Sequence, residues 1–384
     1  MIANNSYIKI FGTMGLSIGL MVILFLSSEQ EVHRNNAFIR RYPPHPITKL
    51  YDLDVGHNSY YIAGFDRDLL YLGNRSAPWH LLQVNMRTKD TLPIRLTPSS
   101  NGLRYRSIHT SVFPPYFFVM DGTMPFILRG RLGEWKAHAW MEGAAFFDRA
   151  VPVDSHLMFI RTISSKTQKS TLGIIKKTTG FQVALDTTLL EAQIDGIFDV
   201  DGTMVLSKET ATMGYVYYYR NQFMTMNLEM KGLHRHRTID TVETAQISLA
   251  EPNLKGDVSM KSPPLFINKA TCMSRNLLLI VSDRLGKNES EEMLDEATIV
   301  DAYDYLKGSY EYSFYIYDIK KHKVREFAVH EGYLVALLDT QISVYETLEP
   351  YFDGPISKIS TNNQSIKDYL LASSGRRSKT RTTE

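Results

Sequence analysis

Cysteine is almost absent from this chain of 384 residues, which contains Cys272 alone. A single cysteine excludes an internal disulfide, a zinc site built from several cysteines and a Cys-x-x-Cys redox pair. We interpret Cys272, which lies in an apolar run, as a small buried side chain. An excess of charge is also lacking, since 43 Lys and Arg face 41 Asp and Glu. No overall field attracts nucleic acid, so we predict no nucleic-acid partner.

Familiar signatures of nucleotide and hydrolase chemistry are missing as well. The chain has no Gly-x-Gly-x-x-Gly fingerprint and no P-loop. We also expect no serine nucleophile elbow, the strand-to-helix turn on which many hydrolases depend. We therefore predict no catalytic residue and no cofactor.

One long apolar run is present, near the N-terminus. Residues 10–26, from Ile10 to Leu26, carry no charge and reach the lower limit of about 17 residues for a bilayer-spanning helix. We predict a membrane anchor over residues 1–28. Bulky Phe25 and Leu26 stand where signal peptidase requires small side chains, which favours an uncleaved signal-anchor over a cleaved signal peptide.

The flanking basic residues leave the orientation open. Arg34, Arg40 and Arg41 follow the run while only Lys9 precedes it, which favours a cytoplasmic domain. A lone N-terminal apolar segment followed by a long domain favours export instead. We predict a single-pass membrane protein with its globular domain outside the cytoplasm.

Most of the remaining chain consists of short apolar or alternating runs separated by turn residues. After a proline-bearing linker at residues 29–46, four such runs follow at residues 60–66, 69–74, 80–85 and 91–96. Four consecutive strands joined by short turns are the content of one propeller blade. We predict an all-β fold, a β-propeller over residues 47–348, with a many-stranded β-sandwich as the main alternative.

The segment Asp-Gly-Thr-Met occurs twice, beginning at Asp121 and at Asp201, each time after an apolar strand candidate. Asp-Gly between apolar runs predicts a hairpin turn in which the glycine has positive φ. The two copies are separated by about two repeats of roughly 40 to 45 residues, the usual blade length. With looser equivalents elsewhere, they predict six blades and leave seven open.

The two ends of the β region complement each other. The strands at residues 333–339 and 341–346 lack an outer partner, and residues 47–54 form an isolated strand before the first full unit. A propeller closes when a strand from one end of the chain completes the blade at the other end. We predict this closure.

Two segments depart from the β pattern. Residues 286–308 are acidic, with apolar side chains near helical spacing, which predicts an amphipathic helical insertion. Residues 349–384 form a C-terminal extension whose basic, polar tail we expect to be disordered.

The whole pattern resembles the membrane-anchored six-bladed β-propeller proteins of Gram-negative bacteria. The resemblance rests on the hairpin YIAGFDRDLLYLGN and the two Asp-Gly-Thr-Met segments, and covers about residues 47–346. It implies a fold and a place in the cell envelope, with the domain in the periplasm. It matches no specific motif, so no catalytic residue is carried over.

Aromatic residues beside polar ones are common in carbohydrate and peptide sites, and six side chains are candidates for a binding surface. They are Trp79, His80, Trp135, His138, His234 and His236. For the tryptophans, Trp140 included, packing between blades is the alternative. For the two histidines in LHRHRTID the alternatives are a solvated basic loop and a metal, although no acidic residues complete a ligand set.

Three acidic residues in DGIFDVDG also invite a metal. Asp195, Asp199 and Asp201 supply the oxygens that calcium prefers, but their spacing does not fit a calcium loop. We predict no metal site and expect Asp199→Asn to matter little.

Two functions from different classes remain. The first is a non-enzymatic binding or assembly module at the cell envelope, with an envelope protein or a glycan as partner. The second is an extracytoplasmic hydrolase or lyase that acts on a glycan or lactone at the propeller channel. A cluster of His, Asp or Glu at the channel mouth would favour the enzyme.

Overall fold

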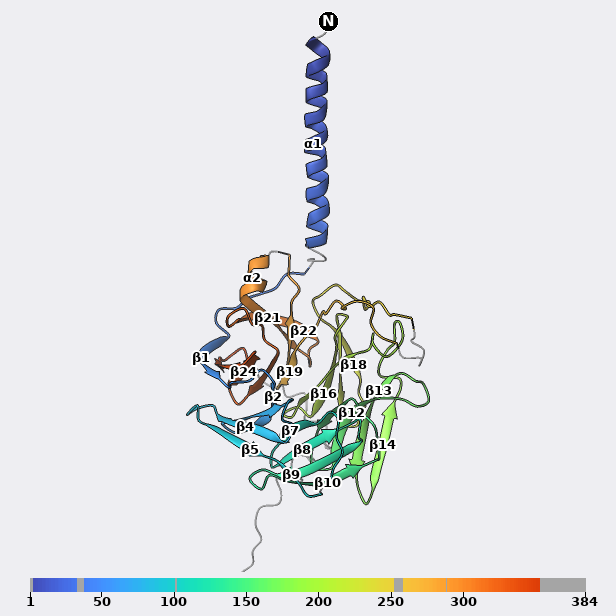
Figure 1. Cartoon of the computed structure of the whole chain (residues 1–384), viewed down its shortest axis with the longest axis vertical. Coiled ribbons are helices and arrows are strands. Elements are labelled where there is room, and N and C mark those ends of the chain that lie inside the picture. Colours follow the sequence, from blue (N-terminus) through green and yellow to red (C-terminus); the bar gives the residue numbers. More distant parts are fainter. Residues whose placement is uncertain (1–2, 33–37, 101, 252–257, 288, 353–384) are drawn as a thin grey trace, which may run out of the picture.

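The computed structural model describes residues 3–32, 38–100, 102–251, 258–287 and 289–352. Within these ranges the chain is mostly β-structure. Helix α1 (Ala3–Val32) precedes the strands, and the short helix α2 (Glu291–Glu296) is inserted among the later ones. Figure 1 shows α1 extending away from the β-domain, in which the strands form several twisted sheets.

The first four strands after β1 confirm the predicted blade. They pair antiparallel in chain order, and they are β2 (Tyr60–Asp66), β3 (Leu69–Asn74), β4 (His80–Asn85) and β5 (Thr91–Arg95). Both faces of this sheet are buried. Leu70 and Leu72 pack in one cluster with Val335 and Leu337, whereas Tyr71 packs on the opposite face in a second cluster. Alternate residues of one strand therefore serve two cores.

The following strands repeat this design in antiparallel groups. These are β7 (His109–Phe113), β8 (Tyr116–Asp121), β9 (Phe126–Arg131) and β10 (Lys136–Glu142); β11 (Arg149–Pro152), β12 (Leu157–Ile163), β13 (Ser170–Lys177) and β14 (Phe181–Asp186); β15 (Gly202–Ser207), β16 (Thr212–Tyr217), β17 (Gln222–Asn227) and β18 (His234–Arg237); β19 (Thr271–Ser274), β20 (Leu277–Ser282), β21 (Ala297–Asp304) and β22 (Ser309–Tyr317). The last group is β23 (Glu326–His330), β24 (Tyr333–Leu338) and β25 (Gln341–Thr347), completed by β1 (Ile47–Asp54), while β6 (Thr97–Pro98) pairs in parallel with β10.

The first strands of successive groups contact one another in a closed ring. β2 contacts β7, β7 contacts β11, β11 contacts β15, β15 contacts β19, β19 contacts β23, and β23 returns to β2. A ring of inner strands with the rest of each sheet extending outward is the architecture of a β-propeller. It lies at the centre of the β-domain in Figure 1, where β2, β7 and β19 come together.

The ring is closed by a strand from the opposite end of the chain, as predicted. β1 pairs antiparallel with β25, from Ile47 opposite Thr347 to Asp54 opposite Gln341. A side-chain hydrogen bond from Ser343 Oγ to Asp52 Oδ1, 2.6 Å long, adds to the ladder. The partner strand removes an edge that would otherwise expose unpaired backbone groups.

The strands form five sheets, one of which has nine strands. That large sheet joins β2–β5 to β7–β10 through one parallel pair, Gly64 opposite Val112. Gly64 has a φ of +145°, and a Cβ there would lie 2.3 Å from the carbonyl oxygen of Val112. Only glycine permits this approach of two inner strands. Because of this fusion, the sheets do not appear as six separate blades.

The two Asp-Gly-Thr-Met segments differ in structure, which corrects the predicted equivalence. Asp121 ends β8 and Gly122 opens the turn to β9, so the first segment is a hairpin. Gly202 instead begins the inner strand β15. Neither glycine has positive φ. Each is required by contact, since a Cβ on Gly122 would lie 1.7 Å from the Phe147 oxygen and one on Gly202 2.3 Å from the Val216 oxygen.

The segment predicted as a helical insertion contains both a short helix and a buried strand. Only residues 291–296 are helical, as α2, and every residue of β21 (Ala297–Asp304) is buried. The apolar residues Val300 and Ala302 therefore face a core cluster between sheets. Ala297 and Val300, whose spacing suggested a helix, lie in this strand, which is buried on both faces and therefore shows no alternation.

The two ends of the chain complete the description. Within the part of the chain that the structure describes, no helix combines the length and apolarity needed to cross a membrane. The anchor predicted over residues 10–26 therefore stays a prediction. Phe352 is buried against Tyr312 and Phe314, which adds residues 349–352 to the domain. The predicted disordered tail lies beyond the described residues.

Candidate functional site

Two of the predicted binding residues line the same recess. Trp79 and His80, where β4 begins, border an open pocket of about 480 Å³. The ring of Tyr105 meets that of Trp79 edge to face at 5.9 Å, and Arg95 lies on the rim. Trp79 also packs against the core between two sheets, so it belongs to both the pocket and the packing. This outer pocket suits contact with a flat or apolar group.

Trp135, His138 and Trp140 do not form one surface. Trp135 packs its ring on Tyr71 and Phe117 in a core cluster, whereas His138 is exposed on β10. Trp140 is buried, and its Nε1 donates to the carbonyl oxygen of Ser155 at 2.9 Å. Trp135 and Trp140 therefore pack inside the domain and do not form a binding surface.

His234 and His236 lie two residues apart on one strand, and their ring centroids are 6.4 Å apart. That strand is the outer strand β18, in place of the solvated loop considered as an alternative. His236 stacks on Phe223 at 4.8 Å, and burial followed by the charge of His234 lowers the pKa of His236. Within the described ranges, no group of three His, Cys, Asp or Glu residues is arranged to hold a metal ion.

The acidic loop before β15 binds its own backbone. Asp199 is fully buried and its carboxylate accepts N–H groups of Gln193 at 2.5 Å and Gly196 at 2.6 Å. Burial alone would raise the pKa of Asp199, but these backbone donors outweigh it and lower the pKa. The carboxylate therefore stabilises the loop, and these contacts lead us to expect that Asp199→Asn is destabilising, against the tolerance that the sequence suggested.

The spacing Gly-x-Ser-x-Gly, which is typical of a nucleophile elbow, occurs from Gly15 to Gly19. These residues lie within the continuous helix α1, where Ser17 Oγ donates to the carbonyl oxygen of Thr13 at 2.9 Å. A nucleophile elbow requires a sharp turn between strand and helix. The match therefore has no catalytic geometry.

The structure brings together a group that the sequence did not single out, where β2, β7 and β11 begin. His109, the first residue of β7, stacks on Tyr61 with ring centroids 4.4 Å apart. The guanidinium of Arg75 lies 5.6 Å from the centre of the Tyr61 ring. Arg149 is the first residue of β11. We call Tyr61, Arg75, His109 and Arg149 the basic cluster.

The imidazole of His109 is reachable by solvent, but the protein around it crowds the ring. Burial, followed by the positive charges of Arg149 and Arg75, lowers the pKa of His109 to about 4. The ring is therefore neutral at pH 7 and carries one N–H donor and one acceptor nitrogen. Tyr61 is fixed beneath it, because its hydroxyl oxygen accepts the N–H of Thr110 at 2.7 Å.

Carboxylates near the basic cluster are already paired. Glu326 accepts from Arg75 at 2.9 Å and from the N–H of Ile62 at 2.9 Å. Asp148 and Asp201 both accept from the buried guanidinium of Arg161, which ties the start of β11 to the start of β15. These ion pairs hold inner strands together at one end of the ring.

The other end of the inner strands carries a different set of side chains. His330, which ends β23, stacks on Phe65 with centroids 4.8 Å apart. The ammonium of Lys208, just after β15, lies 4.1 Å from the centre of the Phe113 ring, and burial lowers the pKa of Lys208. A cation over an aromatic face at this distance is a stabilising contact.

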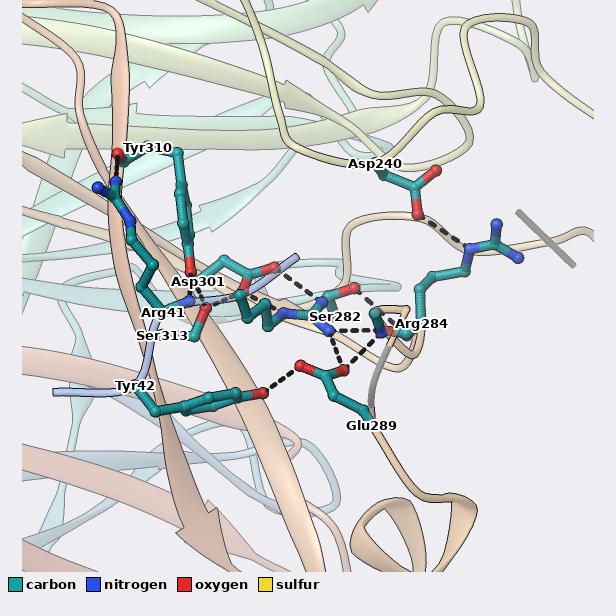
Figure 2. A network of polar contacts seen from close by, with 11 residues as sticks. Arg41, Tyr42, Asp240, Ser282, Arg284, Glu289, Asp301, Tyr310 and Ser313 are labelled. Carbon is teal, nitrogen blue, oxygen red and sulfur yellow. Dashed lines mark hydrogen bonds and ion pairs between the residues drawn. The ribbon is translucent and has the colours of Figure 1, made fainter. Parts of the chain in front are cut away.

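A second feature is the attachment of residues 38–42 to the sheet of β19–β22. Arg40 is buried and its Nη1 donates to Glu289 Oε2 at 2.6 Å, while Asp301 receives its Nε and Nη2. Burial alone would lower the pKa of Arg40, but Asp301 and Glu289 raise it, so the side chain stays charged. Figure 2 shows these contacts with the neighbouring pair of Arg284 and Asp240.

Neighbouring residues extend this attachment. Tyr42 stacks on Tyr315 at 4.6 Å and donates its hydroxyl to Glu289 Oε1 at 2.6 Å, and Arg41 Nη2 donates to the carbonyl oxygen of Tyr310 at 2.6 Å. The segment predicted as a linker is therefore part of the domain from residue 38 onward, as Figure 2 shows for Arg41 and Tyr42.

Comparison with known proteins shows the fold. No family model and no curated protein matches this chain. A solved structure of a DUF4221 family member from Bacteroides vulgatus is similar, with a TM-score of 0.50 and 10% identity, covering 82% of this chain and 98% of that one.

Further similar structures are β-propeller proteins. The Cps50 (Swd1) β-propeller domain from Myceliophteria thermophila has a TM-score of 0.43 and 10% identity, covering 79% of this chain and 100% of its own. BamB from Moraxella catarrhalis has a TM-score of 0.39 and 10% identity, covering 78% of this chain and 97% of its own. At such low identity nothing about the function of these proteins transfers to this chain.

Proposed function

We propose that this protein is a membrane-tethered, non-enzymatic binding module at the cell envelope, built on a propeller of six blades. The blade count treats the nine-stranded sheet as two blades, β2–β5 and β7–β10, that share one bridge. The domain is held outside the cytoplasm by the N-terminal helix, and an envelope protein or glycan is its partner.

The observation that carries the proposal is the buried attachment of Arg40. It fixes the chain to the sheet of β19–β22 a few residues after α1 ends at Val32. Arg40 follows Val32 by eight positions, and eight residues span at most roughly 28 Å. The propeller therefore stays close to the end of α1. The side that carries the sheet of β19–β22 is always the side nearest to that helix end.

The side chains of α1 support a lipid environment. Phe11, Leu16 and Met21 are 70%, 76% and 73% exposed, although they point in different directions around the helix. A helix that is apolar all round is stable where apolar material surrounds it. We expect the acyl chains of a bilayer to supply that material.

The ion pairs at the inner strands support binding over catalysis. Glu326, Asp148 and Asp201 already accept hydrogen bonds from arginines. A general acid or base must be able to exchange a proton with a substrate at working pH, and a carboxylate held by guanidinium is poorly suited to that. His109 lies beside arginines, whereas the hydrolase alternative calls for convergent acids and histidines.

The experiment is membrane fractionation of the native cell with the full chain and a variant that lacks residues 1–32. The full chain should stay with the membranes after a carbonate wash, and the shortened chain should not. Cross-linking in intact cells should then capture an envelope component with the full chain. A full chain released by carbonate would contradict the tether, and turnover of captured material would contradict the non-enzymatic assignment.

A further inference from the structure

We propose that the basic cluster is a binding site for a small anionic group, a carboxylate or a phosphate, held by Arg149 and His109. This inference rests on the proposed function, because it names the chemical class of ligand that the binding module takes. A carboxylate and a phosphate both carry negatively charged oxygens, planar in the first and tetrahedral in the second. A guanidinium group can donate two parallel hydrogen bonds to either.

The donors in this cluster are free to receive such a group. Arg149 is exposed, and although its backbone lies in the β11–β12 ladder, its side chain makes no hydrogen bond or ion pair within the described part of the chain. Its guanidinium can donate two parallel N–H groups to a carboxylate or phosphate. His109 adds one N–H from a neutral ring, and because β7 and β11 contact each other, a donor and a charge lie side by side where these two strands begin.

Competing acceptors inside the protein are occupied. Glu326 holds Arg75, while Asp148 and Asp201 hold Arg161. Among the described residues, no carboxylate is paired with Arg149, although it sits beside a ring whose pKa it lowers. An incoming anion supplies the missing charge without displacing an existing pair.

Three residues of the cluster, Tyr61, His109 and Arg75, are also held in place before a ligand arrives. Tyr61 is held by the N–H of Thr110, and His109 stacks on its ring at 4.4 Å. Arg75 lies over the same ring and is fixed by Glu326 at 2.9 Å. Side chains that are already in place lose little freedom on binding, which favours affinity for a small ligand.

A bound anion should change the protonation of His109. The charged and titratable groups around the ring are Arg149, Arg75, Tyr61 and, through Arg75, Glu326. The two arginines disfavour the imidazolium, and an anion that offsets them raises the pKa of His109 from its value of about 4. Affinity should therefore increase as pH falls through the pKa of the bound state.

The test is calorimetric titration of the full chain in detergent micelles with inorganic phosphate, phenyl phosphate and succinate. At least one probe should bind, and Arg149→Gln should weaken it by roughly tenfold, the loss expected for charge-assisted hydrogen bonds. If only inorganic phosphate and phenyl phosphate bind, the ligand carries a phosphate group. If only succinate binds, the ligand carries a carboxylate.

The matched control is Arg87→Gln. Arg87 is an exposed arginine that pairs with Asp68 at the far end of β2, so this variant removes the same charge away from the cluster and should bind normally. Equal weakening by both variants, or no binding of any probe, would overturn the site. The NMR-measured pKa of His109 should rise with saturating probe in the parent protein.

The two proposals fail separately. Release of phenol from phenyl phosphate would contradict the non-enzymatic function while leaving the anion site in place. Loss of the protein from carbonate-washed membranes would contradict the tether and leave the binding measurements unchanged.

Discussion

Arg40 Nε donates to Asp301 Oδ1 at 2.6 Å and Arg40 Nη2 donates to Asp301 Oδ2 at 3.0 Å, which joins two residues 261 positions apart in the chain. Their side chains are 1% and 4% exposed. Figure 2 shows how Ser313 and Glu289 surround this pair. The contact determines where the N-terminal segment leaves the propeller.

Breaking this pair should destabilise the domain strongly. Arg40→Ala would leave the carboxylates of Asp301 and Glu289 buried without their counter-charge, at a cost of about 3–5 kcal/mol. Arg104→Ala is the control, since Arg104 is exposed and lies outside this attachment, so the loss should be less than about 1 kcal/mol. Chemical denaturation of the protein in detergent, followed by tryptophan fluorescence, measures both free energies. Equal losses would show that the Arg40 contacts are not the attachment.

Alanine at Gly122 should be destabilising for a steric reason. The new Cβ would lie 1.7 Å from the carbonyl oxygen of Phe147, so the backbone must shift, at a cost of ~2 kcal/mol or more. Gly180 is the control, because a Cβ there meets nothing within 4 Å. Thermal unfolding of the two variants decides the matter, and a normal melting temperature for Gly122→Ala would refute the close contact.

Asparagine at position 199 should destabilise the loop before β15. The amide would place an NH₂ group against backbone N–H donors of Gln193 or Gly196, at a cost of about 1–3 kcal/mol. Asp90→Asn is the control, since Asp90 is exposed. Calcium should leave the melting temperature of the parent unchanged. A calcium-dependent rise that Asp199→Asn abolishes would instead reveal a metal site.

The pH dependence of stability follows from the same carboxylate and from Asp121. The pKa of each is lowered in the folded state, because backbone N–H groups outweigh burial. Their stabilisation is complete above the unfolded pKa of about 3.9 and is lost as pH falls through the folded pKa. Melting temperatures between pH 5 and pH 2 should therefore fall less steeply in Asp121→Asn than in the parent. Parallel curves would exclude this contribution.

Removal of β1 should open the propeller. A deletion of residues 47–54 exposes the edge of β25 and the core around Ile342 and Val344. The protein should then aggregate or lose its cooperative transition in calorimetry. Deleting residues 1–32 is the control, because the ring of strands stays complete. A β1 deletion that melts like the parent would contradict the closure.

The sequence by itself determined the strands and their order. Alternating runs such as those of β2, β3 and β4 matched their predicted bounds because side-chain alternation is a local property of an extended chain. Closure by β1 was predictable for a related reason. An isolated strand at one end of the chain and an incomplete sheet at the other each have unpaired backbone groups, which pairing satisfies.

Local pattern failed where a distant contact decides the role of a residue. Gly122 and Gly202 occur in the same tetrapeptide, but one lies in a turn and the other begins an inner strand. β21 was mistaken for helix because both of its faces are buried, which erases the alternation that marks a strand.

Only the tertiary structure decided which polar side chains meet. Nothing local distinguishes His109 or Arg149 from other basic residues, and each matters because it is the first residue of an inner strand in the ring. The same holds for Arg40, whose partner Asp301 lies in a strand late in the chain. Charge pairing acts through space over a few ångströms, so the fold must bring such residues together before their chemistry can be seen.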